Sequence, residues 1–284
     1  MIISCISHKG GTGRTVSLVN IGYRLAEGGN SVCLVDLDLG SPTLLSALGL
    51  DHDAAGVSGE TPGVHRYLSG QAVFSRDDVI DLKREFGLQT DFHVVPGTMF
   101  VGDKDFTRNS IREPLGRLVS TLDKHYDYVL CDLRSGISNV LHALASLPDA
   151  GGPQSGWLLF YRSTPQHIEG LANMIDLLGS ELEGHQSTLP TIGLVRTASL
   201  DPASYPEGEI RKFARARTTE LHREELSIVQ RKPFPLEMGG IPFEPVLQWR
   251  EGVLTERRPS HGVVDPKTIE AYRALANRVK ETFR

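Results

Sequence analysis

The segment His8–Thr15 contains the residues whose types and spacing most clearly suggest chemistry. Three glycines, two cations and two hydroxyl groups follow directly after a short apolar run over residues 1–7. Glycines let the chain curl so that successive backbone N–H groups surround phosphate oxygens without interference from Cβ atoms. The start of a helix adds partial positive charge, and Thr15 supplies a hydroxyl of the kind that ligates Mg²⁺. The segment therefore predicts a loop that binds the phosphates of a nucleotide.

Three aspartates stand at the ends of two further apolar runs. Asp36 and Asp38 close the run over residues 31–37, and the period of a strand points both side chains to one face while the strand lasts. Asp132 closes the apolar run that begins at Tyr126. Many buried strands end in an acid that faces solvent, so each run alone is a weak signal. Their order and spacing after the glycine-rich loop make the combination specific.

Together these segments resemble the ParA/MinD family of P-loop ATPases, whose phosphate-binding loop carries an additional lysine before its glycines. Here that lysine is Lys9, in the pattern K-G-G-x-G-[K/R]-T over residues 9–15, while His8 replaces the glycine that begins the ordinary loop. The resemblance implies that the chain binds ATP and Mg²⁺ through the loop and the first turn of the helix. These nucleotide contacts would come from Gly10, Gly11, Thr12, Gly13, Arg14, Thr15 and Val16.

Arg14 departs from the family pattern, which usually has lysine at this position. Arginine is always charged and can hold a phosphate through two hydrogen bonds, but it does not place its charge as lysine does. We expect the chain to bind ATP despite this difference, but to hydrolyse it slowly.

The resemblance also implies roles for the acids and for the additional lysine. Asp38 would lie near the Mg²⁺ shell and the attacking water, Asp36 would support the site, and Asp132 would hold Mg²⁺ through a water at the end of a Walker B strand. Lys9 would reach across a homodimer to the partner's phosphates, where its charge compensates developing negative charge. The implied catalytic residues are thus Lys9, Asp36 and Asp38, and the implied metal ligands are Thr15, Asp38 and Asp132.

Looser matches continue through the rest of the chain. Ser135-Gly136 resembles the switch loop that senses the γ-phosphate in the family. Arg196-Thr197 follows the strand where the family often contacts adenine. Ile241-Pro242-Phe243 resembles the family's last strand, in which the backbone of the proline commonly lines the base. The resemblance therefore implies that Arg196 and Pro242 bind the nucleotide.

The arrangement of apolar runs predicts the fold that must position these residues. Six short, apolar, β-branched runs indicate a buried, mostly parallel sheet: residues 1–7, 31–37, 91–96, 127–132, 156–161 and 190–195. Apolar residues at helical spacing predict helices over 14–28, 109–124, 166–179 and 266–283. Strand and helix alternate, so we expect an α/β doubly wound fold with helices on both faces of the sheet. A single domain over 1–284 is expected, with irregular insertions near 51–70 and 199–239, the second holding a polar helix and loops.

The composition is that of an ordinary globular protein, with 39% hydrophobic and 23% charged residues. The apolar runs are well short of the ~20 residues of a spanning helix, and the first residues have no basic region of a signal peptide. We therefore expect a cytoplasmic protein without stable membrane insertion. Its three cysteines all lie in apolar runs, which predicts buried thiols and no disulfide framework.

The charge is unevenly distributed along the chain. The net charge is −5, but residues 211–284 carry 15 basic and 10 acidic residues. The basic region 211–232 makes DNA a possible partner, although such a region is more often a solvated face. The basic residues of 266–283 could similarly favour a membrane surface, but its apolar stripe is what docking onto the sheet requires.

Several function classes remain open from the sequence. The leading one is an ATP-dependent homodimeric switch with a regulatory or positioning role, acting through an unidentified protein partner. A nucleotide-binding scaffold with little turnover is the main alternative because of Arg14, and an ATP-dependent metabolic synthetase of the same superfamily is a further one. A bacterial tyrosine kinase shares the motifs, but here only Tyr272 lies near the C-terminus, where such kinases carry a tyrosine cluster.

Overall fold

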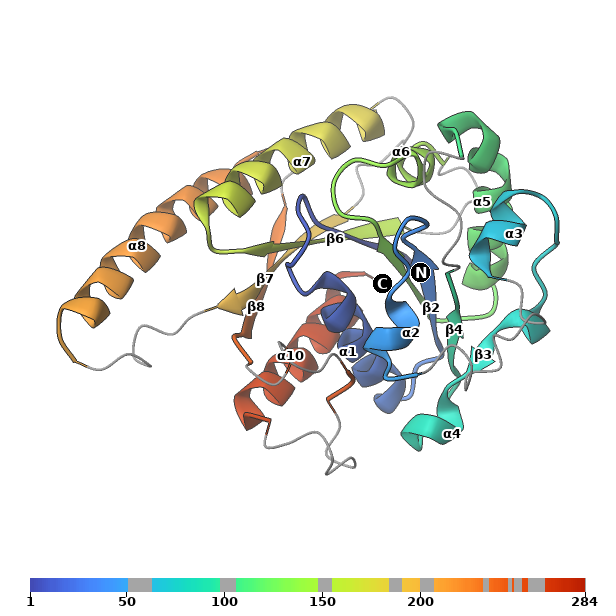
Figure 1. Ribbon diagram of the computed structural model, residues 1–284, viewed down its shortest axis with the longest axis horizontal. Coiled ribbons are helices and arrows are strands. Elements are labelled where there is room, and N and C mark those ends of the chain that lie inside the picture. The colour runs from blue at the N-terminus through green and yellow to red at the C-terminus, as the bar shows by residue number, and fades with distance from the viewer. Residues whose placement is uncertain are drawn as a thin grey trace.

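The centre of the protein is an eight-stranded sheet (Figure 1). The computed structural model describes residues 1–50, 63–97, 106–147, 155–183, 191–199, 207–231, 235–244, 247, 252–254 and 264–283. The strands are β1 (Ile2–Ile6), β2 (Val32–Leu37), β3 (Ile80–Asp81), β4 (Phe92–Val95), β5 (Tyr128–Leu133), β6 (Ser155–Arg162), β7 (Thr191–Ser199) and β8 (Leu236–Pro242). Their spatial order is β3-β4-β2-β5-β1-β6-β7-β8. All neighbouring pairs are parallel except β3 with β4.

The sheet is buried on both faces, as its apolar strands predict. Every residue of β1, β2, β4 and β5 is buried. Within β5, Val129 and Cys131 face one hydrophobic cluster, while Tyr128 and Leu130 face the other. The six expected strands are therefore confirmed, and the α/β doubly wound fold with them. β7 extends to Ser199, beyond the expected end, because its polar last residues pair with β8 across a register shift.

Helices cover both faces of this sheet. They are α1 (Arg14–Glu27), α2 (Leu44–Ala47), α3 (Val64–Leu68), the 3-10 turn η1 (Arg76–Asp78), α4 (Lys83–Phe86), α5 (Arg108–Asp123), α6 (Asn139–Ala145), α7 (Pro165–Glu183), α8 (Glu209–Val229) and α10 (Pro266–Thr282). On one face, α5, α6 and α7 cover the strands, and α1 and α10 lie on the other (Figure 1). The helices expected over 14–28, 109–124, 166–179 and 266–283 correspond to α1, α5, α7 and α10.

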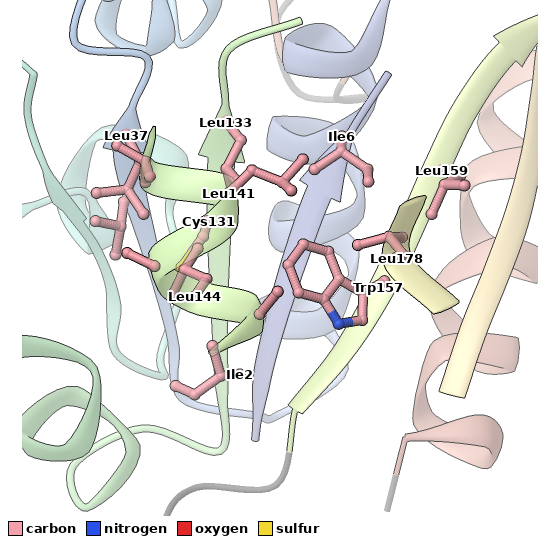
Figure 2. Packing of buried hydrophobic residues seen from close by; sticks show 14 of the residues in the cluster. Ile2, Ile6, Leu37, Cys131, Leu133, Leu141, Leu144, Trp157, Leu159 and Leu178 are labelled. Atoms are coloured by element: carbon pink, nitrogen blue, oxygen red, sulfur yellow. The ribbon is translucent and has the colours of Figure 1, made fainter. Parts of the chain in front are cut away.

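Trp157 shows how the first face is packed. Its indole lies between strand residues such as Ile2 and helix residues such as Leu178 of α7 (Figure 2). Leu141 and Leu144 of α6 cover the same face above β5 (Figure 2). Burying large apolar side chains contributes about 1.5–3 kcal/mol each, so this layer fixes the strands that end at the glycine-rich loop.

α10 docks on the second face, as its apolar stripe predicts. Tyr272, Leu275, Ala276 and Val279 are buried, and the helix packs against α1 and β8. The Tyr272 hydroxyl lies 3.3 Å from the Ser17 hydroxyl of α1. Among the helices of the described residues, none combines the length and apolar character that crossing a membrane requires.

The segments expected to be irregular contain more regular structure than their sequences suggest. Region 199–239 holds the polar helix α8 and most of strand β8. Gly239 and Gly240 interrupt the apolar pattern of β8, so the strand is recognisable by its pairing with β7 rather than by its composition. Within 51–70, residues 51–62 lie outside the described residues, and 64–68 form α3, whose apolar side chains enter the core.

The cysteines are free and buried, as expected. Burial raises the pKa of the Cys131 thiol to about 12, and the pKa values of the other two thiols are also raised, chiefly by burial. The thiolate is the reactive form of cysteine, so these side chains act as small hydrophobic residues.

Candidate nucleotide-binding site

The glycine-rich loop connects the buried end of β1 to the first turn of α1. Gly11 and Gly13 adopt φ values of +74° and +71°, which only glycine reaches without strain. Gly13 precedes the helix and offers no side-chain cap, so the first-turn N–H groups have no capping side chain. The exposed glycines and the helix N-terminus together form the arrangement that binds anions in proteins.

Thr197 attaches the loop to the end of β7. The Thr197 hydroxyl donates a hydrogen bond to the backbone carbonyl of Thr12 and lies 3.1 Å from the carbonyl of Tyr161. Both Thr12 and Thr197 are buried. The bond between Thr197 and Thr12 could not be predicted from the sequence, because the two residues lie 185 positions apart in the chain.

Arg14 points into the protein, toward the aspartates. Its Nε donates to Asp132 Oδ1 at 2.5 Å, one terminal nitrogen lies 3.4 Å from the Ser7 hydroxyl, and the other lies 3.8 Å from Asp38 Oδ2. The Arg14 side chain is 8% exposed. Its expected role in binding phosphate stays a prediction, since here the guanidinium joins two carboxylates.

Asp132 and Thr15 meet beneath the loop. Asp132 is fully buried at the end of β5, and the Thr15 hydroxyl donates to its Oδ2 at 2.7 Å. The strand register places Asp132 beside Asp36 of β2. The register therefore brings the ends of the two strands together beneath the loop.

Asp36 is a buried acceptor for backbone groups. Its two oxygens accept hydrogen bonds from the N–H groups of Asp38 and Leu44, each at 3.1 Å. Burial and the neighbouring Asp132 raise the pKa of Asp36. The geometry shows Asp36 fixing the turn from β2 into α2, which is how it could support the site.

Asp38 lies closer to the surface than Asp36. Its Oδ1 accepts a hydrogen bond from the N–H of Ser41 at 3.1 Å, while Oδ2 faces Arg14. Burial raises the pKa of Asp38, and the nearby Arg14 charge opposes that increase. Asp38 and Asp132 therefore lie on two sides of one guanidinium.

Lys9 and His8 connect the loop to α7. The Lys9 ammonium is exposed and donates to the Gln166 side chain at 3.2 Å. The His8 ring packs against Gly170, where an added Cβ would lie 2.0 Å from His8 Nδ1. A larger residue at position 170 would therefore clash with the His8 ring in its present position.

Of the remaining predicted segments, Ser135-Gly136 borders the loop. The N–H of Gly136 donates to the Ser7 carbonyl at 2.8 Å, so Ser135-Gly136 lies beside the glycines, as a switch segment must. Arg196 instead forms an ion pair with Glu225 of α8 at 3.2 Å. Pro242 ends β8 opposite Ser199. Base contacts by Arg196 and Pro242 stay predictions.

The residues around Thr15 are of the type that Mg²⁺ requires. Mg²⁺ is usually held in proteins by one or two carboxylates together with phosphate oxygens and water. The Thr15 hydroxyl and the carboxylates of Asp132 and Asp38 supply such oxygen donors. The donor types fit the ion, while the Arg14 guanidinium lies among the same oxygens.

A strand, a glycine loop and a helix, with aspartates at the ends of two neighbouring strands, define a P-loop nucleoside-triphosphatase fold. A family model described as AAA domain matches residues 1–145, half of the chain. The chain belongs to this family, and the resemblance to ParA and MinD proteins is confirmed.

Similar proteins agree with this assignment. The septum site-determining protein MinD of Thermotoga maritima is 26% identical over 143 residues, covering 48% of this chain and 45% of that protein. The chain thus matches about half the length of this curated relative.

Two solved structures share the fold over almost the whole chain. MinD of Pyrococcus horikoshii, complexed with Mg-ADP, has a TM-score of 0.65 at 21% identity, covering 99% of this chain and 96% of that one. A putative plasmid partition protein of Borrelia burgdorferi, bound to AMPPNP, also has a TM-score of 0.65, at 16% identity, with 99% and 98% covered. At these identities the likeness establishes the fold alone.

Proposed function

We propose that this protein is an ATP-binding, slowly hydrolysing molecular switch of the ParA/MinD type that forms a homodimer around ATP and acts in the cytoplasm. The observation that supports this most directly is the uncapped first turn of α1 behind Gly11 and Gly13, with Asp38 and Asp132 beside it. The Mg-ADP bound to the Pyrococcus protein and the AMPPNP bound to the Borrelia protein support ATP as the ligand.

Each residue of the loop has a distinct part in this proposal. The backbone N–H groups from Gly10 to Thr15 bind phosphate oxygens, and the first turn of α1 adds its partial positive charge. Thr15 and Asp132 would hold Mg²⁺, which supplies neutralising charge to the phosphates when it is bound. Asp38, which lies closer to the surface than Asp36, orients the attacking water and accepts its proton.

Lys9 acts on the partner subunit in this proposal. Its ammonium is exposed and contacts Gln166 rather than the cluster beneath its own loop. An exposed cation beside the mouth of the loop can move to the phosphates of a facing subunit at little cost. Two such lysines would offset the repulsion between two nucleotides in one interface.

A protein is the partner that the surface favours over DNA. The basic region 211–232 also carries acids, and Arg211 and Arg231 form ion pairs with Glu207 and Asp176. Mixed charge of this kind gives a weaker field for nucleic acid than a continuous basic stripe. The regulatory role is therefore exerted through a protein partner in this proposal.

A scaffold that binds nucleotide with little turnover is the second candidate, favoured by Arg14. The guanidinium is held by Asp132 and Asp38, two of the residues that hydrolysis would use. Binding requires mainly the loop backbone, whereas turnover requires these carboxylates.

The test is calorimetry with ATP and ADP in excess Mg²⁺, combined with sizing in ADP and in a non-hydrolysable ATP analogue. The switch requires nucleotide binding, a dimer with the analogue only, and measurable release of phosphate. Binding and dimer formation without phosphate release would identify the scaffold. A folded protein that binds neither nucleotide would refute both candidates.

A further inference from the structure

Arg14 lies between the carboxylates of Asp132 and Asp38 in a geometry that a lysine cannot reproduce. Its guanidinium contacts Asp132 at 2.5 Å through Nε, and its terminal nitrogens face the Ser7 hydroxyl and Asp38 at 3.4 and 3.8 Å. A planar fork can make these three contacts at once, while a lysine ammonium is a single point of charge on a flexible stem.

This position makes Arg14 the counter-charge of Asp132. Asp132 is fully buried, and a buried carboxylate requires a compensating cation or hydrogen bonds. Thr15 donates one hydrogen bond to Asp132, and within the described part of the chain Arg14 is the cation that forms an ion pair with it. Because the guanidinium does not lose its proton in proteins, this charge is permanent.

A divalent ion between Thr15 and Asp132 would therefore lie beside a fixed positive charge. The Asp132 oxygen that faces Thr15 is separated from the oxygen that holds Arg14 by one carboxylate carbon. The two cations would repel each other at close range in a site largely shielded from water, where screening is weak.

We propose that the Arg14 guanidinium serves as the built-in cation of this site, so that the loop binds a nucleoside di- or triphosphate with little dependence on a divalent metal. The inference rests on the proposed nucleotide binding, and it gives to Arg14 the neutralising role that the proposed function gives to Mg²⁺. Arg14 neutralises the carboxylates in place of the ion, and the loop backbone and helix N-terminus supply the remaining attraction for phosphate. Arg14→Lys would remove the fork and make nucleotide binding depend on the metal.

Calorimetry with ADP, in excess Mg²⁺ and in EDTA, measures this dependence directly. The dissociation constant of the wild-type chain should change by less than about threefold between the two conditions, and that of Arg14→Lys by at least about tenfold. Arg24→Lys is the matched control, because Arg24 is a buried arginine of the same helix that pairs with Glu27, and it should behave as the wild type.

The outcomes separate this inference from the proposed function. Equal metal dependence of the wild type and Arg14→Lys would overturn the inference while leaving nucleotide binding intact. Absence of ADP binding in every condition would overturn the proposed function instead.

Titration of the chain with Mn²⁺ alone, followed by electron paramagnetic resonance, tests Arg14 without any nucleotide. Arg14→Gln exposes the Thr15–Asp132 oxygens to a metal, so it should bind Mn²⁺ at least about tenfold more tightly than the wild type. Adding Asp132→Asn should abolish the gain. If Arg14→Gln is folded and gains no Mn²⁺ binding, the inference is wrong; if it does not fold, the comparison with Arg14→Lys decides.

Discussion

The Thr197 hydroxyl donates a hydrogen bond to the backbone carbonyl of Thr12, joining the end of β7 to the middle of the glycine-rich loop. Both residues are buried, so water cannot replace the bond if it is lost. The loop is therefore held in shape from a strand that lies two positions away from β1 in the sheet.

Thr197→Val should weaken both folding and nucleotide binding. The valine keeps the shape of threonine but leaves the Thr12 carbonyl without this donor, which costs about 1–3 kcal/mol in the free energy of unfolding. Denaturant unfolding and ADP calorimetry measure the two effects. Thr121→Val is the control, because Thr121 makes a comparable bond on the surface of α5; equal losses in the two variants would contradict the role assigned to Thr197.

Thr15→Ala should reduce the affinity for ADP in the presence of Mg²⁺. It removes a hydroxyl that donates to Asp132 at the first turn of α1, where the phosphates are proposed to bind. We expect dissociation constants to rise about tenfold, equivalent to roughly 1.4 kcal/mol, as measured by calorimetry. An unchanged affinity in Mg²⁺ would show that Thr15 contributes to neither phosphate nor metal binding.

Asp38→Ala should lower turnover far more than nucleotide binding. Loss of a group that orients water and accepts a proton typically costs a factor of about 10² or more in kcat. Phosphate release and ADP calorimetry on the same preparation separate the two quantities. Parallel losses of affinity and turnover would instead assign Asp38 a structural role.

Asp36→Ala is the comparison for Asp38, since Asp36 holds two backbone N–H groups and is buried. Replacing Asp36 should therefore lower mainly the free energy of unfolding.

Gly170→Ala should displace His8 and, through it, the loop. The new methyl group would lie 2.0 Å from the imidazole, and overpacking of this kind costs about 1–3 kcal/mol. Denaturant unfolding and ADP affinity should both decline. Gly116→Ala is the control within α5, where the added Cβ meets only the flexible end of Leu147; a Gly170→Ala variant as stable as that control would exclude the His8 contact.

The sequence contained the parts of the site that are local in the chain. The glycines from Gly10 to Gly13 and the start of α1 could be placed because their spacing alone specifies a phosphate-binding turn. Asp36 and Asp132 could be placed because each ends an apolar run, and strand ends in a parallel sheet meet at one edge.

The contacts that join distant segments could not be inferred in this way. The direction of the Arg14 side chain depends on Asp132, which is 118 positions away, and the bond from Thr197 to Thr12 spans 185 positions. Of strand β8, the family resemblance indicated only the end at Ile241-Pro242. Its glycines and Glu237 give no apolar period, so its pairing with β7 defines the rest.

Lys9→Ala provides the strongest test of a dimeric switch. In the proposed function the loop backbone binds the phosphates of its own subunit, whereas the Lys9 side chain extends to Gln166 at the surface. Removing it should therefore leave the affinity of the monomer for ATP nearly unchanged. The ATP-dependent dimer and turnover should both disappear, because two nucleotides facing each other would lose two cations in a desolvated interface.

Gln166→Ala is the matched control for this variant, since it removes the partner of Lys9 within its own subunit and keeps the cation. If Lys9 acts on the facing subunit, the control should dimerise at least as well as the wild type, because the lysine no longer has to leave a hydrogen bond. Analytical ultracentrifugation with a non-hydrolysable ATP analogue distinguishes the variants. A Lys9→Ala chain that dimerises and hydrolyses ATP like the wild type would show that the lysine is only a solvated turn residue and would remove the main support for a switch that works as a dimer.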